Sequence, residues 1–225
     1  MEKLRIRSGN IPKTGPENDI WKKYSDVVDI AAIGHYTEFG FMSPKIKNIC
    51  GKSKKIFGRA VTVRIPSQES KALHVAVSMA QEGDVIVVDR CGDTNHACVG
   101  EMVALCANIR KLAGIVVDGP ITDYEEIEEI GIPVFATGIS PLTTKFIIDC
   151  GEINYDISCG GVPVHPGDYI LADKNGVLVL REFEIDELIK TAIADQEEES
   201  GDKKSILAGK TLQELYVPEY PINNL

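Results

Sequence analysis

The feature that most constrains this chain is an alternation of apolar runs and helical segments between residues 85 and 136. The runs predict buried strands, and the segments between them predict helices that end near Gly114 and Gly131. The expected strands are 85–88, 115–117 and 133–136, and the expected helices are 101–113 and 123–130. Because strands separated by helices pair in parallel through right-handed crossovers, the pattern predicts an α/β fold with a parallel βαβαβ section.

The residues on either side of this section show different patterns of predicted secondary structure. Residues 59–65 (RAVTVRI) alternate with the period of a strand, and a helix is expected over 69–81. After residue 142 the chain changes to short strands with tight turns, expected at 153–158, 169–172 and 177–180. This part is predicted to form an antiparallel or barrel-like section.

The chain of 225 residues, 44% of them hydrophobic, can bury a full core. We expect a single domain over 1–225, with a helical N-terminal leader over about 1–40 and a charged helical tail over about 182–225. Within the leader, residues 19–34 (DIWKKYSDVVDIAAIG) have apolar side chains at a helical period.

Composition excludes several classes of function. With 24 basic against 34 acidic residues, the net charge is 24 − 34 = −10, which opposes binding to nucleic acid. No apolar run is long enough to span a membrane and the start lacks a signal-type segment, so a cytoplasmic protein is expected. The six cysteines have no CxxC spacing, which favours free thiols that behave as small buried hydrophobes over structural zinc.

Two loops are candidates for a site, because ligands bind at the carboxyl ends of parallel strands. The loop after Val88 (DRCGDTNHACVGEMVA) brings Gly100 to the start of a helix, where free N–H groups and the helix dipole can hold a carboxylate or phosphate. A glycine there lets the ligand approach closely. The alternative is a plain helix entry. His96 lies in the same loop, but a lone histidine is more often a packing residue.

The loop after Val117 (VVDGPITDYEEI) carries Asp118 and Asp123. Thr122 or Asp123 can serve merely as N-cap of the following helix. The functional alternative is that Asp123 gives one carboxylate to Mg²⁺ or Mn²⁺, ions that keep several waters, beside the amides of the first loop. Together they would chelate a small oxo acid. Nucleophile elbows, P-loops and dinucleotide fingerprints are absent from the sequence.

The motifs GDVIVVD, GDTNHACVGEMVA, VVDGPITDYEEI, IPVFATGISP and GEINYDISCGGVPVHPGDYILADKNGVLVL resemble the RraA-like family over about residues 25–180. This family includes pyruvate aldolases that act on 4-hydroxy-4-methyl-2-oxoglutarate and 4-carboxy-4-hydroxy-2-oxoadipate, and the regulator of ribonuclease activity A. The resemblance implies a swivelling β/β/α sandwich, a homotrimer with sites near subunit boundaries, and a metal held by Asp123. Some relatives carry the older name demethylmenaquinone methyltransferase, but this sequence has no glycine-rich loop of the kind that binds S-adenosylmethionine.

The resemblance also implies a substrate-binding set. The amides of four residues would hold the substrate carboxylate, namely Gly100, Glu101, Met102 and Val103. The family's substrate-binding arginine falls on Thr122, so this chain lacks it, which puts pyruvate-type substrates in question.

In the aldolase reaction, cleavage of the C3–C4 bond leaves a pyruvate enolate and requires a base for the C4 hydroxyl proton. Asp93 and Glu101 are the carboxylates nearest by motif; surface ion pairing, or dipole compensation for Glu101, is the alternative. The leading interpretation is a metal-dependent aldolase-like lyase acting on a small oxo or hydroxy acid. The alternatives are a non-catalytic regulatory binding protein and a metal enzyme of another reaction type.

Overall fold

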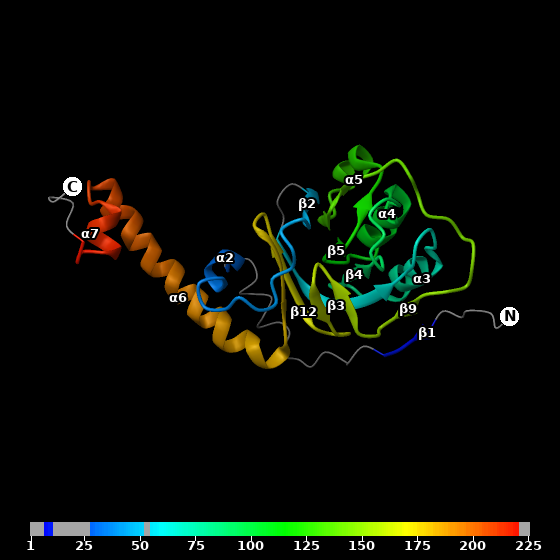
Figure 1. The fold of residues 1–225 in the computed structure, drawn as a ribbon, viewed down its shortest axis with the longest axis horizontal. Helices are drawn as coiled ribbons and strands as arrows, with labels where there is room; N and C mark the ends of the chain where they lie inside the picture. The colour runs from blue at the N-terminus through cyan, green and yellow to red at the C-terminus, as the bar shows by residue number, and fades with distance from the viewer. Residues whose placement is uncertain (1–6, 11–27, 52–54, 221–225) are drawn as a thin grey trace.

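The computed structural model describes residues 7–10, 28–51 and 55–220, and its centre is a mixed, curled sheet (Figure 1). The strands follow the order β1-β9-β3-β4-β5-β7-β2, and β12 pairs with both β3 and β13. Their bounds are β1 Arg7–Ser8, β2 Lys47–Cys50, β3 Ile56–Arg64, β4 Val85–Asp89, β5 Gly114–Val117, β7 Val134–Ala136, β9 Glu152–Ile153, β12 Tyr169–Asp173 and β13 Gly176–Leu180.

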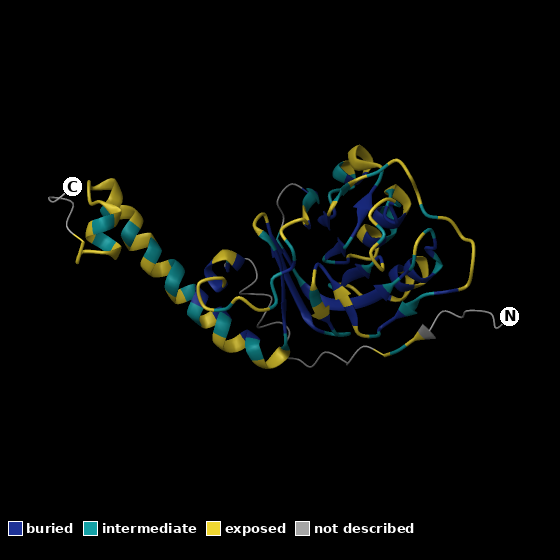
Figure 2. Ribbon diagram, viewed as in Figure 1, coloured by how far each residue is buried: buried dark blue, intermediate teal, exposed yellow. Residues whose placement is uncertain are grey.

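The predicted parallel section is confirmed. Strands β3, β4, β5 and β7 are parallel neighbours, and the connections between them contain α3 (Lys71–Met79), α4 (Glu101–Ile109) and α5 (Tyr124–Ile130). Apolar side chains of these helices and strands form one buried cluster (Figure 2). The near-continuous apolar runs of the strands arise because both faces of the sheet are covered.

The predicted antiparallel section is also confirmed, and β3 joins it to the parallel one. Residues 56–59 of β3 pair antiparallel with β12, whereas residues 60–64 pair parallel with β4. The second face of the sheet packs on a hairpin of β10 (Ile157–Cys159) and β11 (Val162–Val164). The curled sheet with helices on one face agrees with the α/β sandwich expected from the sequence.

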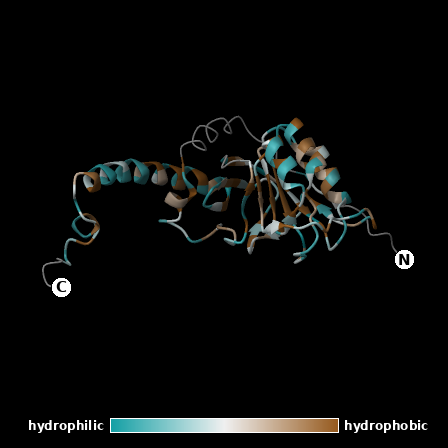
Figure 3. Cartoon of the chain, turned by 90° about the horizontal axis from the view of Figure 1, so that it is seen from above, coloured by the Kyte–Doolittle hydropathy of each residue, from teal (hydrophilic) through white to brown (hydrophobic). Residues whose placement is uncertain are grey.

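The C-terminal tail is helical, as expected. Helix α6 (Glu182–Leu207) buries Ile185, Ile189 and Ala192 against the outer surface of β12 and β13 and against the short α2 (Ile30–Ile33). Farther along, α6 leaves the body of the protein and its side chains become mostly hydrophilic (Figures 1 and 3). It is followed by α7 (Leu212–Tyr216). The described helices include no segment with the length and hydrophobicity that a membrane span requires.

Three expectations need correction or restriction. The strand expected over 153–158 is wrong, because Asn154 takes a left-handed backbone (φ +58°) that ends β9 before β10 begins. The helix expected over 101–113 stops at Ile109, because Lys111 is left-handed as well (φ +57°). Most of the leader helix expected over 19–34 lies outside the described residues.

Candidate functional site

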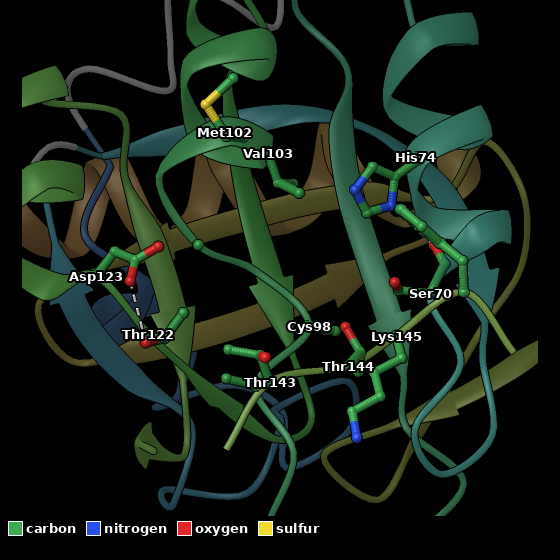
Figure 4. Close-up of a pocket in the computed structure, with 13 residues that line it drawn as sticks. Ser70, His74, Cys98, Met102, Val103, Thr122, Asp123, Thr143, Thr144 and Lys145 are labelled. Carbon is green, nitrogen blue, oxygen red and sulfur yellow. Dashed lines mark hydrogen bonds between the residues drawn. The ribbon is translucent and has the colours of Figure 1, made fainter. Parts of the chain in front are cut away.

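A cleft of about 250 Å³ opens beside the carboxyl ends of β4 and β5. Its volume is at the small end for ligand sites, which favours a small metabolite. Figure 4 shows Thr122 and Asp123 on one side of the cleft and Ser70, His74 and Lys145 on the other. The remaining lining residues are Ala97, Cys98, Gly100, Met102, Val103, Thr143, Thr144 and Phe146.

The two loops that the sequence singled out meet in this cleft. The N–H of Thr122 donates to the carbonyl of Val99 at 2.9 Å, and Val99 forms a β-bridge with Ile121. Ile121 belongs to the short strand β6 (Pro120–Ile121), which pairs in parallel with β8 (Gly138–Ile139). These contacts fix the end of the second loop against the entry to α4.

Asp123 directs its carboxylate to the neighbouring helix rather than to its own. It occupies the N-cap position of α5 with a left-handed backbone (φ +52°), yet it makes no side-chain cap there. Instead Oδ2 accepts the N–H of Glu101 at 2.9 Å, and Oδ1 accepts the Thr122 hydroxyl at 3.2 Å. The reading of Asp123 as a simple cap of the helix that follows it is therefore wrong.

Gly100 is required by this arrangement. It is the N-cap residue of α4, and a Cβ there would lie 2.5 Å from Oδ2 of Asp123 and 3.0 Å from the Thr122 methyl carbon. Its backbone is extended (φ −133°), so the reason for glycine is the close approach of Asp123 and not an unusual conformation.

The start of α4 presents backbone donors to the cleft. The first helix-type bond runs from Ala104 N–H to Gly100 O (3.1 Å), so the amides before Ala104 lack this kind of partner. The Glu101 amide is bound by Asp123, whereas Met102 and Val103 line the cleft. The side chain of Glu101 is exposed and does not line the cleft.

Asp93 and His96 pair with each other outside the cleft lining. Asp93 Oδ2 lies 2.8 Å from His96 Nδ1, and Oδ1 accepts the N–H groups of Asn95 and His96. Burial opposes the charged form of this carboxyl, but these hydrogen bonds and the His96 ring outweigh it and lower the pKa of Asp93. A carboxylate held in this way is a weak base.

Two other charged residues of the loops hold the backbone in place. Asp118 accepts the N–H of Gly160 at 2.9 Å. Arg90 is fully buried, and its guanidinium donates to the carbonyls of Ile65, Ser67 and His96. Both residues organise the loops around the cleft without lining it.

Sequence reasoning missed the opposite side of the cleft. His74 comes from α3, and its Nδ1 lies 3.0 Å from the carbonyl of Ser70, while the ring meets Phe146 edge-on. Lys145 comes from the segment after β8. No motif marks these residues. The Ala97–Thr143 bridge joins the segment that carries Lys145 to the first loop, and the Glu69–Lys145 bridge joins it to the residues before α3.

A divalent cation at Asp123 would have one protein carboxylate. Among the described residues, the one group of three close candidate ligands is His35, Asp195 and Glu199, which do not line the cleft. Asp123 itself is exposed, and within the described part of the chain Oδ1 has only the Thr122 hydroxyl as a hydrogen-bond donor. Mg²⁺ commonly keeps several waters and takes one or two carboxylates, so this donor set fits Mg²⁺ or Mn²⁺.

Comparison of the sequence with known proteins shows a family match and several relatives. The sequence model of the RraA-like family (Aldolase/RraA) matches residues 24–179. An uncharacterized protein of Methanocaldococcus jannaschii is 35% identical over 172 residues, which cover 76% of this chain and 82% of the relative. A protein of Halalkalibacterium halodurans, provisionally named 4-hydroxy-4-methyl-2-oxoglutarate aldolase, is 34% identical over 155 residues, covering 69% and 73%.

Solved structures agree with this assignment. RraAS2 of Streptomyces coelicolor, described as an unusual member of a family of ribonuclease inhibitors, superposes with a TM-score of 0.74 at 26% identity, covering 85% of this chain and 99% of that one. RraA of Thermus thermophilus, described as an inhibitor of RNA processing, has a TM-score of 0.60 at 27% identity, covering 76% and 94%.

Proposed function

The chain belongs to the RraA-like family, and from this premise we propose that it is a divalent-metal-dependent lyase of the aldolase type. Its substrate would be a small oxo or hydroxy acid. The observation that carries the proposal is the Asp123 carboxylate in the cleft, 2.9 Å from the amide that begins α4. One carboxylate beside unpaired backbone donors is suited to an acid that also binds a cation.

The carboxylate and the 2-oxo group of the substrate would each have a binding partner in the cleft. The amides of Met102 and Val103 would bind the substrate carboxylate at the positive end of the α4 dipole. Asp123 would hold Mg²⁺ or Mn²⁺. When bound, the cation would polarise the 2-oxo group and stabilise the negative charge that develops on its oxygen.

Cleavage also needs a base for the C4 hydroxyl. The base takes the hydroxyl proton, the C4 carbonyl forms, the C3–C4 bond breaks, and its electron pair passes into the enolate of the 2-oxo acid. Asp93 is held by the His96 ring at 2.8 Å and lies outside the cleft lining. The side chain of Glu101 also lies outside the cleft lining, but it is exposed and belongs to the residue between Gly100 and Met102, which both line the cleft. We therefore favour Glu101 as the base.

Thr122 shapes the proposed substrate preference. Where relatives of the aldolase type have an arginine, this chain offers a hydroxyl that donates to Asp123 at 3.2 Å. A hydroxyl can donate or accept one hydrogen bond but carries no charge. The native substrate would therefore present a neutral or hydroxyl group at that point.

We further propose that the protein is a homotrimer with the cleft near a subunit boundary. Apolar side chains are exposed on the segment that forms one side of the cleft, namely Leu142, Phe146, Ile147 and Ile148. Clusters of this kind mark interaction surfaces. Light scattering tests the assembly, and a stable monomer at micromolar concentration would contradict it.

A thermal-shift screen of oxo and hydroxy acids, each with and without Mg²⁺, tests the proposed function. A ligand that binds the folded state raises the melting temperature by mass action. We expect stabilisation by a 2-oxo acid only when Mg²⁺ is present, and loss of the effect in Asp123→Asn. Absence of any such ligand would favour the alternative of a non-catalytic regulatory binding protein, since two structural relatives are described as a member of a ribonuclease-inhibitor family and as an inhibitor of RNA processing.

A further inference from the structure

A group of three side chains that can bind a metal lies where α2 meets α6, outside the cleft lining. The group consists of His35, just after α2, and of Asp195 and Glu199 on α6, and their ligand atoms lie within 4.8 Å of one another. We propose that these residues bind Zn²⁺ or a similar first-row transition-metal ion, which fastens the C-terminal helix to the body of the protein. The inference is independent of the proposed lyase site at Asp123.

Packing and hydrogen bonds hold α2 and α6 against each other (Figure 1). Apolar side chains of both helices belong to one buried cluster. The N–H of Asp29, at the start of α2, donates to Oε1 of Gln196 at 3.1 Å. Beyond the other end of α2, the Tyr36 hydroxyl donates to Oδ1 of Asp195 at 2.9 Å. The backbone that carries His35 is therefore positioned against α6 by contacts that need no metal.

Asp195 has a buried oxygen without a hydrogen-bond donor. Its Oδ1 accepts the Tyr36 hydroxyl, but its Oδ2 is buried and has no hydrogen-bond partner among the described residues. A carboxylate oxygen in this position is costly, because it has lost its hydration without gaining a replacement. A metal ion bound to Oδ2 would supply the missing partner, which the hydrogen bond to Tyr36 alone does not.

Glu199 and His35 complete the ligand set. Glu199 follows Asp195 by four residues, so the two carboxylates lie on the same face of α6. The contact of Glu199 with Lys203 at 3.7 Å joins two solvent-accessible side chains, so it contributes little and can give way to a metal. The exposed His35 ring has no hydrogen-bond or ion-pair partner within the described ranges, which leaves its nitrogens available.

The donor set favours a transition metal over Mg²⁺. Zn²⁺ accepts imidazole nitrogen and carboxylate oxygen with bonds of about 2.0–2.2 Å, whereas Mg²⁺ prefers oxygen ligands. Ligand atoms on one Zn²⁺ ion lie up to about 4 Å apart, so small side-chain rotations would close the separations found here. The acidic run over 195–199 (DQEEE) adds a negative potential that attracts cations to this part of α6.

Calorimetric titration of the full chain with Zn²⁺ tests the site. The wild type is compared with His35→Gln, Glu199→Gln and the matched control Glu197→Gln, an exposed residue of the same acidic run. Because Zn²⁺ also accepts carboxylates, each comparison is repeated in Asp123→Asn, which removes the proposed Mg²⁺ ligand. We expect His35→Gln and Glu199→Gln to lower the Zn²⁺ affinity at least about tenfold, since even residues that only support a ligand change metal affinity by that factor. Glu197→Gln should bind like its parent.

Hydrogen exchange tests whether the ion fastens the helix. Zn²⁺ should slow amide exchange in α6 of the wild type and of Glu197→Gln, but not of His35→Gln. Equal Zn²⁺ affinity in His35→Gln and its parent would overturn the site, and exchange in α6 that ignores Zn²⁺ would overturn the fastening role. Mg²⁺ binding at Asp123 and Zn²⁺ binding at His35 are lost in different variants, so failure of one proposal is distinguishable from failure of the other.

Discussion

The carboxylate of Asp123 accepts the backbone N–H of Glu101 at 2.9 Å, so a residue at the start of one helix caps the start of another. The bond joins the carboxyl ends of the two central strand–helix units. It also places Asp123, the one carboxylate among the described residues that line the cleft, directly against the backbone donors of α4. The Asp123 side chain therefore both stabilises the start of α4 and forms part of the proposed ligand site.

Truncation of Asp123 should reveal this capping role. Asp123→Ala removes the acceptor for the Glu101 amide and should lower the free energy of unfolding by about 0.5–2 kcal/mol. Asp123→Asn keeps an oxygen acceptor and tolerates the left-handed backbone, so it should cost much less. Urea unfolding measures both variants, and equal losses would argue against the cross-helix cap.

Gly100→Ala should displace Asp123. The added Cβ would lie 2.5 Å from Oδ2, so either the carboxylate or the backbone must shift, with a destabilisation of about 1–3 kcal/mol. We expect Mg²⁺ affinity to fall together with stability. Gly138→Ala is the control, because a Cβ there meets nothing within 4 Å. If Gly100→Ala and Gly138→Ala had the same effect on stability and on Mg²⁺ affinity, the close approach of Asp123 to residue 100 would be unimportant.

Protonation of Glu69 should lower the free energy of unfolding at acidic pH. Burial opposes its charged form, but four backbone N–H donors, that of Ile148 foremost, outweigh burial and lower its pKa below the ordinary 4.5. A lowered folded-state pKa means that the stabilisation is complete above about pH 4.5 and is lost as the pH falls through the folded-state pKa.

The test compares urea midpoints of the wild type and Glu69→Gln between neutral and acidic pH. At neutral pH, Glu69→Gln should cost about 1.5–3 kcal/mol, because an amide presents a donor where the native oxygens accept. The difference between the two proteins should shrink in acid. The exposed Glu125→Gln serves as control, and a pH-independent difference would contradict the prediction.

Thr122→Arg should raise aldolase activity. The wild type lacks one charge-assisted hydrogen bond at the oxo group, which corresponds to roughly 1.5–3 kcal/mol, or about 10- to 100-fold in kcat/KM. We therefore expect weak or no cleavage of 4-hydroxy-4-methyl-2-oxoglutarate by the wild type and a measurable increase in the variant. A coupled assay of pyruvate release decides this. Efficient cleavage by the wild type would show that another cation replaces the arginine, and silence from both forms would favour a different reaction.

Much of the architecture could be predicted because local pattern and burial agree. Strands such as β4 and β5 are covered on both faces, so their apolar runs are unbroken and easy to recognise. Parallel pairing then brings their carboxyl ends together, which is why Gly100 and Asp123 could be placed at one site from sequence.

The remaining features depend on contacts that no local pattern encodes. Lys145 reaches the cleft because its segment pairs with residues far away in the chain, including those just before α3, the helix that carries His74. The Asp123 carboxylate accepts from the start of α4 and not from its own helix because the Asp123 backbone is left-handed (φ +52°). The residue type alone does not reveal this backbone conformation. Asn154 breaks an apparently continuous strand for the same kind of reason.

Calorimetric titration with Mg²⁺ tests the central claim most directly, by comparing the wild type, Asp123→Asn and the control Glu125→Gln. We predict one site per chain in the wild type and in the control, and no measurable binding in Asp123→Asn, while its urea midpoint stays near that of the wild type. Binding of Mg²⁺ to Asp123→Asn with unchanged affinity would contradict the assignment of Asp123 as the metal ligand.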